Sequence, residues 1–463
     1  MPNFALNNKK DWGISVEEKA ILETITNLIE NKRISDLREF LENVKSADFP
    51  SIFEECSEPK IIMIYRLLSK EKAARVFVEL EHDSQERLIN YLTDKEIKNV
   101  MNEIYMDDAV DLIEEMPSDV VNRILINTKP EDRKIINELL KYPEDTAGTI
   151  MTTEFIDLKE NMTVKEAFQR IKKKGMDSEN VYICYILSID RKLLGVLDIK
   201  DLLISERSTY VRDIMKTNVI KAYTLDDQED VTKMFDKYDL VAIPVVDKEE
   251  RLVGIVTIDD AIDVMQEETL EDFEKMAAIT PTEDTYFKTS VFKHTQTRIV
   301  WLLVLMITSI ITGGIIENFE GAIASLPILV SFIPLLMGTG GNCGSQTSTL
   351  IIRGLATDEI EVKDIFKVIW KELRIAIIVG IILAIANGIR ILIIYHDLKI
   401  AIAVGLALIG TVIVSKFLGA ILPIGAKKLG ADPALMAAPL ITTVVDIASV
   451  LLFFNISTLI FHL

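Results

Sequence analysis

The chain has 463 residues, of which 71 are Asp or Glu and 51 are Lys or Arg, and its formal net charge at pH 7 is −20. The length predicts about three domains, and the negative charge excludes a nucleic-acid-binding protein because such a chain repels phosphates. Three cysteines (Cys56, Cys184 and Cys343) and four histidines are too few for a disulfide framework or a Cys- or His-rich zinc centre.

The charge is divided unevenly along the chain. Residues 1–288 carry 61 acidic and 39 basic side chains, a net charge of −22, whereas residues 289–463 carry ten and twelve, a net charge of +2. The first residues, MPNFALNNKKDWGIS, lack a basic stretch followed by an apolar one. We therefore expect no cleaved signal, and an acidic N-terminal half that stays in the cytosol.

Residues 1–145 are predicted to form an acidic, all-α superhelical N domain. Apolar residues recur three and four positions apart, and the turns MPSD and TKPED separate helices of about a dozen residues. A packing or docking module is the plain interpretation. One helix contains the acidic group MDDAVD.

Residues 146–265 contain an internal repeat. The pair Ile150-Met151 recurs as Ile214-Met215, and each copy combines β-branched strands with one amphipathic helix. This pattern predicts two α/β units, at 146–208 and 209–265. The phrases IM, IPVVD and VGIVTIDD give the repeat a specific resemblance to a tandem CBS-domain pair.

The resemblance implies a regulatory pair that often binds adenine nucleotides. Thr257 and Asp260 match the family's ribose-contacting Thr-x-x-Asp, so ATP is a candidate modulator. In the first copy Asp198 replaces the threonine, which puts one of the two nucleotide sites in doubt. A purely structural pair is the alternative.

An acidic connecting helix is expected over 266–297, continuing the end of the second unit. The stretch DDAIDVMQEETLEDFE, residues 259–274, has eight acids and no Lys or Arg. Asp260, Asp263, Glu267 and Glu271 fall near one helix face, where like charges are destabilising unless they are neutralised. With MDDAVD and the group YTLDDQED at 223–230, this pattern predicts divalent cations that bridge carboxylates of different domains. A solvated acidic face is the alternative.

Residues 298–463 are predicted to form an all-α transmembrane domain of five helices. The apolar runs are long enough to span a bilayer and lie at 299–316, 321–352, 375–396, 400–426 and 433–462. Five spans place the two termini on opposite sides of the membrane.

Basic residues near the span ends predict the orientation. With the N-terminus cytoplasmic, only Arg390 and Lys399 lie near the outer side. The inner side then carries Lys288, Lys293, Arg298, Arg353, Lys363, Lys367, Lys371, Arg374, Lys427 and Lys428. We therefore expect a multi-pass plasma-membrane protein with an external C-terminus.

The second apolar run, PILVSFIPLLMGTGGNCGSQTSTLII, has the composition of a pore. Two prolines interrupt helical hydrogen bonding, and four glycines allow close approach of backbone. Membranes tolerate irregular backbone of this kind only inside protein or beside water. Amide and hydroxyl oxygens suit a hard, hydrated cation. A glycine-rich helix contact is the alternative.

Asp446 is the single formal charge between Pro433 and His462. On a helix that begins at Pro433, it is expected about 20 Å along the axis. A carboxylate at mid-span costs about 2.5–3.5 kcal/mol on insertion scales, so we expect it to face a water-filled path and attract a cation. Thr442 and Thr443 share its helix face. The alternative is an ion pair between Asp446 and Lys416, although we expect Lys416 to reach toward the interface.

The whole order of segments resembles the MgtE family of magnesium channels. The matching motifs are YPEDTAGTIM, YDLVAIPVVD, LVGIVTIDD, GGNCGSQ and DPALMAAPLITTVVD, spread over nearly the whole chain.

The resemblance implies a homodimer that needs Mg²⁺. The implied pore residues are Asp446, Gly341, Asn342, Ser345, Thr349 and Thr442. The implied regulatory Mg²⁺ ligands are Asp107, Asp111, Asp227, Glu229, Asp239, Asp260, Asp263, Glu268 and Asp272.

From this resemblance we predict a Mg²⁺-selective channel for Mg²⁺ uptake, closed by cytosolic Mg²⁺. The rival hypotheses are a secondary transporter that exchanges Mg²⁺ for H⁺ or Na⁺, and a membrane-anchored sensor that does not conduct. Oxygen ligands also suit Mn²⁺, Co²⁺ and Ca²⁺. We expect no enzyme, because neither a nucleophile–base pair nor a phosphate loop is apparent.

Overall fold

The computed structural model describes residues 16–175, 178–282, 286, 289–436 and 438–462. The chain divides into two compact units, unit 1 (1–265) and unit 2 (266–463). The N-terminal stretch inspected for a signal, and Lys288, lie outside the described residues.

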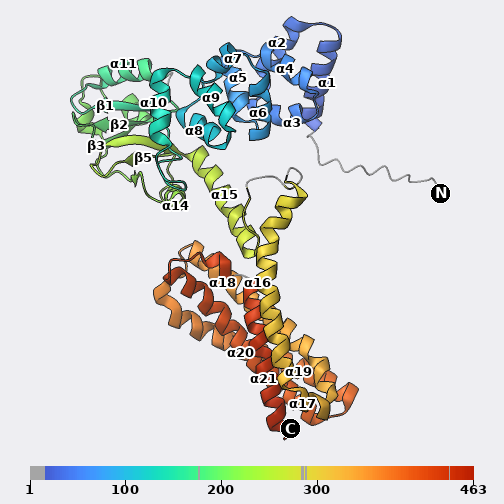
Figure 1. The fold of residues 1–463 in the computed structure, drawn as a ribbon. Coiled ribbons are helices and arrows are strands. Elements are labelled where there is room, and N and C mark those ends of the chain that lie inside the picture. Colours follow the sequence, from blue (N-terminus) through green and yellow to red (C-terminus); the bar gives the residue numbers. More distant parts are fainter. Residues whose placement is uncertain (1–15, 176–177, 283–285, 287–288, 437, 463) are drawn as a thin grey trace, which may run out of the picture. The chain divides into compact units, whose positions relative to one another are not determined.

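The first part of unit 1 is a succession of short helices (Figure 1). A capping box at Thr93 and Glu96 starts α7, and Ser69 caps α5. The predicted all-α N domain is confirmed. Its elements are α1 (Val16–Glu30), α2 (Ile34–Asn43), η1 (Ser46–Asp48), α3 (Phe49–Glu54), α4 (Glu58–Leu67), α5 (Lys70–Val78), α6 (His82–Tyr91), α7 (Asp94–Val100), α8 (Met106–Glu115), α9 (Ser118–Asn127) and α10 (Pro130–Leu139).

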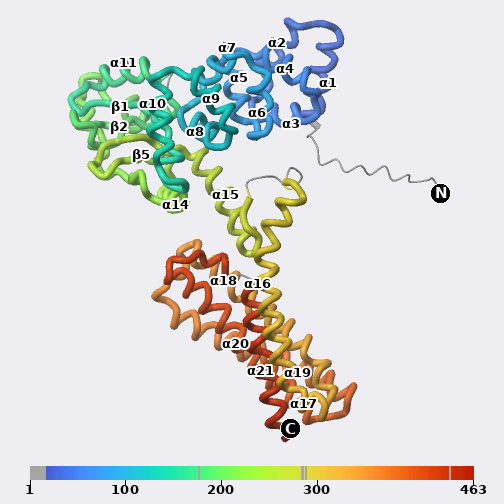
Figure 2. The backbone as a smooth tube through the Cα atoms, in the orientation of Figure 1, coloured from blue at the N-terminus to red at the C-terminus, as the bar shows by residue number. Residues whose placement is uncertain are grey.

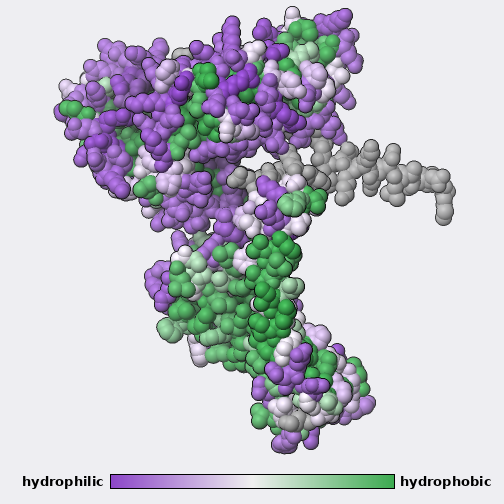
Figure 3. Space-filling view, viewed as in Figure 1, coloured by the Kyte–Doolittle hydropathy of each residue, from purple (hydrophilic) through white to green (hydrophobic). Residues whose placement is uncertain are grey.

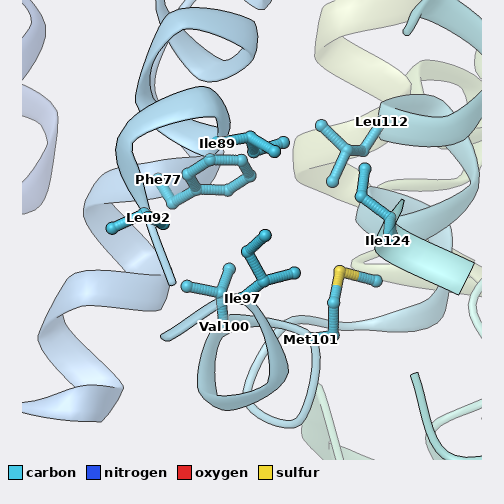
Figure 4. A pocket seen from close by; sticks show the side chains of 8 residues that line it. All are labelled: Phe77, Ile89, Leu92, Ile97, Val100, Met101, Leu112 and Ile124. Atoms are coloured by element: carbon cyan, nitrogen blue, oxygen red, sulfur yellow. The ribbon is translucent and has the colours of Figure 1, made fainter. Parts of the chain in front are cut away.

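The helices of this domain pack around apolar side chains with one small gap (Figure 4). The gap has a volume of about 10 Å³ and exposes only apolar surface. A buried water needs about that volume and two to four polar partners, so the gap offers no site for a polar ligand. The lining residues are Phe77, Ile89, Leu92, Ile97, Val100, Met101, Leu112 and Ile124.

The second part of unit 1 contains two α/β units, which confirms the CBS-type repeat (Figure 1). Each has a three-stranded sheet whose first two strands are parallel and whose last two are antiparallel. The elements are β1 (Phe155–Lys159), α11 (Val164–Lys174), β2 (Asn180–Leu187), β3 (Leu193–Asp198), α12 (Ile199–Ile204), α13 (Val211–Ile214), β4 (Ala222–Tyr223), α14 (Gln228–Tyr238), β5 (Ala242–Val246), β6 (Leu252–Thr257) and α15 (Ile258–Met276).

Met and Gly recur in the two α/β units because the opening segment of each unit packs against the last strand of the other. A Cβ atom at Gly254 of the second unit would lie 2.8 Å from Met151 Sδ of the opening segment of the first. A Cβ at Gly195 of the first would lie 3.1 Å from Met215 Sδ. Each opening segment therefore packs on the other unit's last strand, and only glycine admits it.

Unit 2 contains five helical segments long and apolar enough to span a membrane, within the described residues. They agree with the five predicted spans, and Figure 3 shows hydrophobic surface over these helices. The elements are α16 (Val291–Asn318), α17 (Glu320–Ser325), η2 (Pro327–Phe332), α18 (Ile333–Ala356), η3 (Val362–Asp364), α19 (Ile365–Tyr395), α20 (Leu398–Lys428), η4 (Pro433–Met436) and α21 (Ala438–Phe461).

Helix α20 is the centre of unit 2, and its chain path can be followed in Figure 2. It packs against α18, α19 and α21, and most of its apolar stretch is buried, whereas α16 and α19 are largely exposed. Long apolar helices with exposed apolar faces require lipid or another subunit as their surroundings.

Two local expectations about these spans were wrong. The glycine-rich segment is not irregular backbone but part of the continuous helix α18, which begins beside Pro334 after the 3₁₀ segment of Pro327. The last helix begins at Ala438 rather than at Pro433, so Asp446 lies eight residues, or about 12 Å, along it.

The glycines of α18 permit close helix packing. A Cβ at Gly340 would lie 2.7 Å from Val445 Cγ1 on α21 and 2.9 Å from Thr411 Cγ2 on α20, and one at Gly344 would lie 2.7 Å from Ile441 Cγ2. The helix-contact interpretation therefore applies to this face of α18.

We predict that Gly340→Ala lowers the thermal unfolding midpoint of the detergent-solubilised protein, since overpacking costs about 1–3 kcal/mol. Gly388→Ala is the matched control, because nothing lies within 4 Å of a Cβ there. Equal midpoints for the two variants would contradict this packing.

Candidate cation sites

Three carboxylates converge in unit 1. One ligand oxygen from each of Asp107, Glu179 and Asp260 lies within 4.8 Å of the others. Asp107 is in the first turn of α8, Glu179 directly precedes β2, and Asp260 is in the first turn of α15. The group, called the acid cluster below, thus draws on the N domain and on both α/β units.

The start of α8 is held against the first α/β unit by Glu154. Its carboxylate accepts hydrogen bonds from the backbone N–H of Met106 and from the Thr152 hydroxyl, the latter at 2.8 Å. The positive end of the α8 dipole favours negative charge at this position. Asp107 and Asp108 are therefore presented from a fixed helix terminus.

The acid cluster lacks enough compensating charge to ionise normally. Burial and the neighbouring Glu179 and Asp260 raise the pKa of Asp107 well above its usual value. Burial, then Asp260, raises the pKa of Asp108 to about 7 and that of Glu179 to about 8. Desolvation by the surrounding chain, then Asp108 and Asp260, raises the pKa of Asp111 to about 7, although its side chain is exposed at the surface.

Two oxygens in the acid cluster have no protein partner. Asp107 Oδ1 and Glu179 Oε2 are buried without a hydrogen bond to any residue that the structure describes. A buried, unpaired carboxylate is costly, and hard cations such as Mg²⁺ and Ca²⁺ prefer oxygen ligands. The arrangement suits a divalent cation.

The structure brings together only some of the predicted regulatory ligands. Asp107 and Asp111 each interact electrostatically with Asp260, and burial and Asp259 raise the pKa of Asp263. Asp108, Glu179 and Asp259 are not among the predicted ligands. Asp108 lies inside the quoted MDDAVD group, but Glu179 belongs to no motif, and only the fold reveals it.

The other predicted ligands have local roles or lie elsewhere. Asp227 caps α14 by accepting from the Glu229 N–H at 2.9 Å, and Glu229 pairs with Lys233 at 2.8 Å. Asp239 ends α14 in a left-handed conformation. These residues do not join the acid cluster in the described part of the chain. Glu268 and Asp272 lie farther along α15, in unit 2.

The candidate nucleotide motif shares a residue with the acid cluster. The buried Thr257 hydroxyl lies 2.5 Å from both Asp259 Oδ1 and Asp260 Oδ2. In the first α/β unit, the equivalent Asp198 instead forms an ion pair with Lys216. The two units therefore differ chemically at the nucleotide motif.

In unit 2, one face of α18 forms a polar stripe that one copy of the chain leaves largely uncovered. Gly338, Asn342 and Thr349 are exposed and Ser345 is partly exposed. Their spacing of four, three and four residues places them on one helix face. This polar stripe lies away from the buried glycine face.

Asp446 is next to the polar stripe. A Cβ at Gly341 would lie 2.8 Å from Thr442 Cγ2, and Thr442 is one turn before Asp446 on the same face of α21. Contacts run from Ile441 at Gly344 to Ser449 at Gly340, so α18 and α21 are antiparallel. Asp446 is half-buried at the level of the Gly338–Gly341 turn.

The expected behaviour of Lys416 was wrong. Its side chain does not reach the interface and does not pair with Asp446. Lys416 is 7% exposed, and its Nζ lies 3.2 Å from Glu372 Oε2 on α19. Lys416 therefore does not neutralise Asp446.

Family models match most of the chain. A divalent cation transporter model, MgtE, matches residues 333–456, and the MgtE intracellular N domain matches 44–145. CBS-domain models match 147–206 and 211–267.

Individual relatives agree with these matches. The magnesium transporter MgtE of Bacillus subtilis is 34% identical over 94% of this chain and 96% of its own length. The magnesium transporter MgtE of Thermus thermophilus is 32% identical over 91% and 94%. A crystal structure of the cytosolic domain of the Mg²⁺ channel MgtE in complex with ATP is 32% identical, with a TM-score of 0.50, and covers 52% of this chain and 99% of its own.

We predict that metal-free protein gains stability as the pH falls from 8 to 6. The folded pKa values of Asp108, Asp111 and Glu179, about 7 to 8, exceed the usual 3.8 to 4.5. The folded state therefore holds protons that the unfolded state releases, and its stability falls as the pH rises through this window. The measurement is the thermal unfolding midpoint of unit 1 in chelator.

Mg²⁺ should replace these protons and stabilise the protein most at pH 8. Asp107→Asn should weaken both the pH dependence and the Mg²⁺ effect, whereas Asp119→Asn, at an exposed position of α9, should leave both unchanged. If Asp107→Asn responds to pH and Mg²⁺ as wild type does, the acid cluster is not the cation site.

Proposed function

Because the chain belongs to the MgtE family of divalent cation transporters, we propose that it forms a homodimeric, Mg²⁺-selective channel. The channel mediates Mg²⁺ uptake and closes when cytosolic Mg²⁺ binds the acidic residues of the N domain, the CBS pair and α15. The uncovered polar stripe beside Asp446 is the observation that carries the proposal.

The polar stripe cannot face lipid without cost. Asn342, Ser345 and Thr349 expose groups that hydrocarbon does not hydrogen-bond, and a membrane carboxylate such as Asp446 normally faces a cavity or a partner. A second copy of the chain, related by two-fold symmetry, would enclose water between two polar stripes. The contact between Gly341 and Thr442 brings α18 and α21 together at the wall of this water-filled path.

The chemistry of this path suits a hydrated cation. Mg²⁺ dehydrates reluctantly and keeps several bound waters. The amide and hydroxyl groups of the polar stripe can form hydrogen bonds with these waters. The two Asp446 carboxylates then attract the cation electrostatically. Mn²⁺ and Co²⁺, which also accept oxygen ligands, are secondary candidates for transport.

The acid cluster supplies a mechanism for closure. Without Mg²⁺ its carboxylates repel, and with Mg²⁺ they are bridged, so the ion favours the compact state by its differential affinity. Asp107, Asp111, Asp260 and Asp263 are the proposed ligands in this region, with Asp108 and Glu179 added by the structure. The remaining proposed regulatory ligands are Asp227, Glu229, Asp239, Glu268 and Asp272.

Helix α15 is tied to the segment that precedes the Asp446 helix. Lys275 Nζ lies 2.8 Å from Glu271 Oε1 and 2.9 Å from Asp432 Oδ2. Asp432 in turn accepts from the Ala434 N–H at 2.8 Å, at the start of η4. A shift of α15 would therefore be transmitted to α21.

The CBS pair supports both dimerisation and nucleotide binding. Leu203 on α12 and Ile262 on α15 occupy equivalent positions of the two units and are exposed, as is Ile204. A second copy would cover this apolar surface. ATP, bound by a relative's cytosolic domain, is the proposed modulator at Thr257 and Asp260.

The protein is a multi-pass membrane protein, and we propose that its N-terminus is cytoplasmic and its C-terminus external. The basic residues near the span ends support this orientation. It places the acid cluster in the compartment whose Mg²⁺ it would sense.

We predict that Asp446→Asn reduces Mg²⁺ uptake into proteoliposomes by at least about tenfold. Two unit charges about 4 Å apart, at an effective dielectric constant of about 20, interact with an energy of about 4 kcal/mol. Removing the carboxylate charge therefore removes a large attraction for the cation. The vesicles contain a magnesium dye and no Mg²⁺, and no H⁺ or Na⁺ gradient is applied. Glu317→Gln, an exposed carboxylate at the end of α16, is the control.

Equal uptake by wild type and Asp446→Asn would remove this carboxylate from the permeation path. No uptake by either, from folded dimer, would favour the ion-coupled transporter or the non-conducting sensor.

A further inference from the structure

A closed polar triangle joins three helices inside unit 2. Lys416 Nζ on α20 donates to Glu372 Oε2 on α19 at 3.2 Å and to Thr347 Oγ1 on α18 at 3.0 Å. The Thr347 hydroxyl donates to the same Glu372 oxygen at 3.0 Å. The set is called the α18 anchor below.

The α18 anchor is buried inside the bundle. Thr347 is 1% exposed, and Glu372 and Lys416 are 7% exposed. Lys416 lies about 18 Å along α20 from Lys428. Glu372, in contrast, lies between Lys371 and Arg374 near the charged end of α19. Buried ionised side chains are rare unless they are paired.

Stability alone does not explain a buried ion pair. Replacing such a pair by well-packed apolar residues is often neutral or stabilising, whereas the best-attested role of buried polar groups is to fix register. The role of the α18 anchor therefore depends on which helix its hydrogen bonds hold in position.

The α18 anchor acts on the helix that carries the polar stripe. Close contact between α18 and α20 occurs at Gly419, where a Cβ would lie 2.5 Å from the Gly344 carbonyl oxygen. A contact between glycines is smooth and does not by itself fix the rotation of one helix against another. Hydrogen bonds to Thr347 do fix it, since their geometry is directional.

Thr347 lies two positions from both Ser345 and Thr349. At 100° per residue, a side chain two positions away points to a nearly opposite face. Holding Thr347 on α19 and α20 therefore directs Ser345 and Thr349 away from the bundle and toward the proposed pore.

We propose that Glu372, Lys416 and Thr347 are positioning residues that set the rotation of α18 and thereby the ion selectivity of the path lined by the polar stripe. The proposal rests on the channel function proposed above. The residues do not touch the permeating ion, so their effect is on selectivity rather than on cation attraction.

The first test is Thr347→Val, which removes the link to α18 and leaves the Glu372–Lys416 ion pair in place. We expect the Mg²⁺/Ca²⁺ permeability ratio to change by about threefold to tenfold, the factor that one hydrogen bond carries. The unfolding midpoint should stay near that of wild type. Thr411→Val is the matched control, because Thr411 is 1% exposed and its hydroxyl has no partner among the described residues.

The second test separates positioning from stability. Glu372→Gln and Lys416→Met each leave one charge buried and should lower the unfolding midpoint. The double variant Glu372→Met/Lys416→Met should recover the midpoint but not the permeability ratio. Recovery of both, or an unchanged ratio in Thr347→Val, would overturn the proposal.

A readout independent of transport distinguishes this inference from the proposed function. In protein with Cys56, Cys184 and Cys343 replaced by Ala, Ser345→Cys should react with a water-soluble maleimide at a rate that Thr347→Val changes. If wild type conducts no Mg²⁺, the channel proposal fails. If Thr347→Val leaves the maleimide reaction rate of Ser345→Cys unchanged, the proposal that the α18 anchor sets the rotation of α18 fails as well.

Discussion

Crowded carboxylates that one chain cannot neutralise dominate the chemistry of this protein. In the acid cluster, Asp107, Glu179 and Asp260 offer oxygens within 4.8 Å of one another. The groups that raise their pKa values electrostatically are other carboxylates. The compact arrangement of the N domain and CBS pair therefore needs protons or cations. We propose that this requirement makes the fold responsive to Mg²⁺ near neutral pH.

Helix α18 combines close helix packing with the polar stripe of the proposed pore. Its glycine face packs against α20 and α21, while its polar stripe is left for water or a second copy. The two faces depend on each other, since the close packing at Gly340 and Gly344 and the hydrogen bonds of Thr347 together determine where the opposite face points. A pore built on such a helix can be altered through residues that never meet the ion.

Sequence patterns predicted the architecture well where periodicity or repetition was strong. The helical N domain, the paired α/β units and the five spans follow from spacing alone. Composition misled where the same residues serve two purposes, as the glycines of α18 suited both irregular backbone and close helix packing. Lys416 was misjudged because its partner, Glu372, lies outside the predicted apolar run, between Lys371 and Arg374. Glu179 belongs to no motif, and only the fold brings it to Asp107.

The most direct test of the account is the electrical behaviour of the purified protein in a planar bilayer with a Mg²⁺ gradient and no H⁺ or Na⁺ gradient. The account predicts a current that reverses at the Mg²⁺ equilibrium potential and stops when Mg²⁺ is raised on the side of the N domain. A current that depends on an H⁺ or Na⁺ gradient, or that persists at high Mg²⁺ on that side, would contradict it.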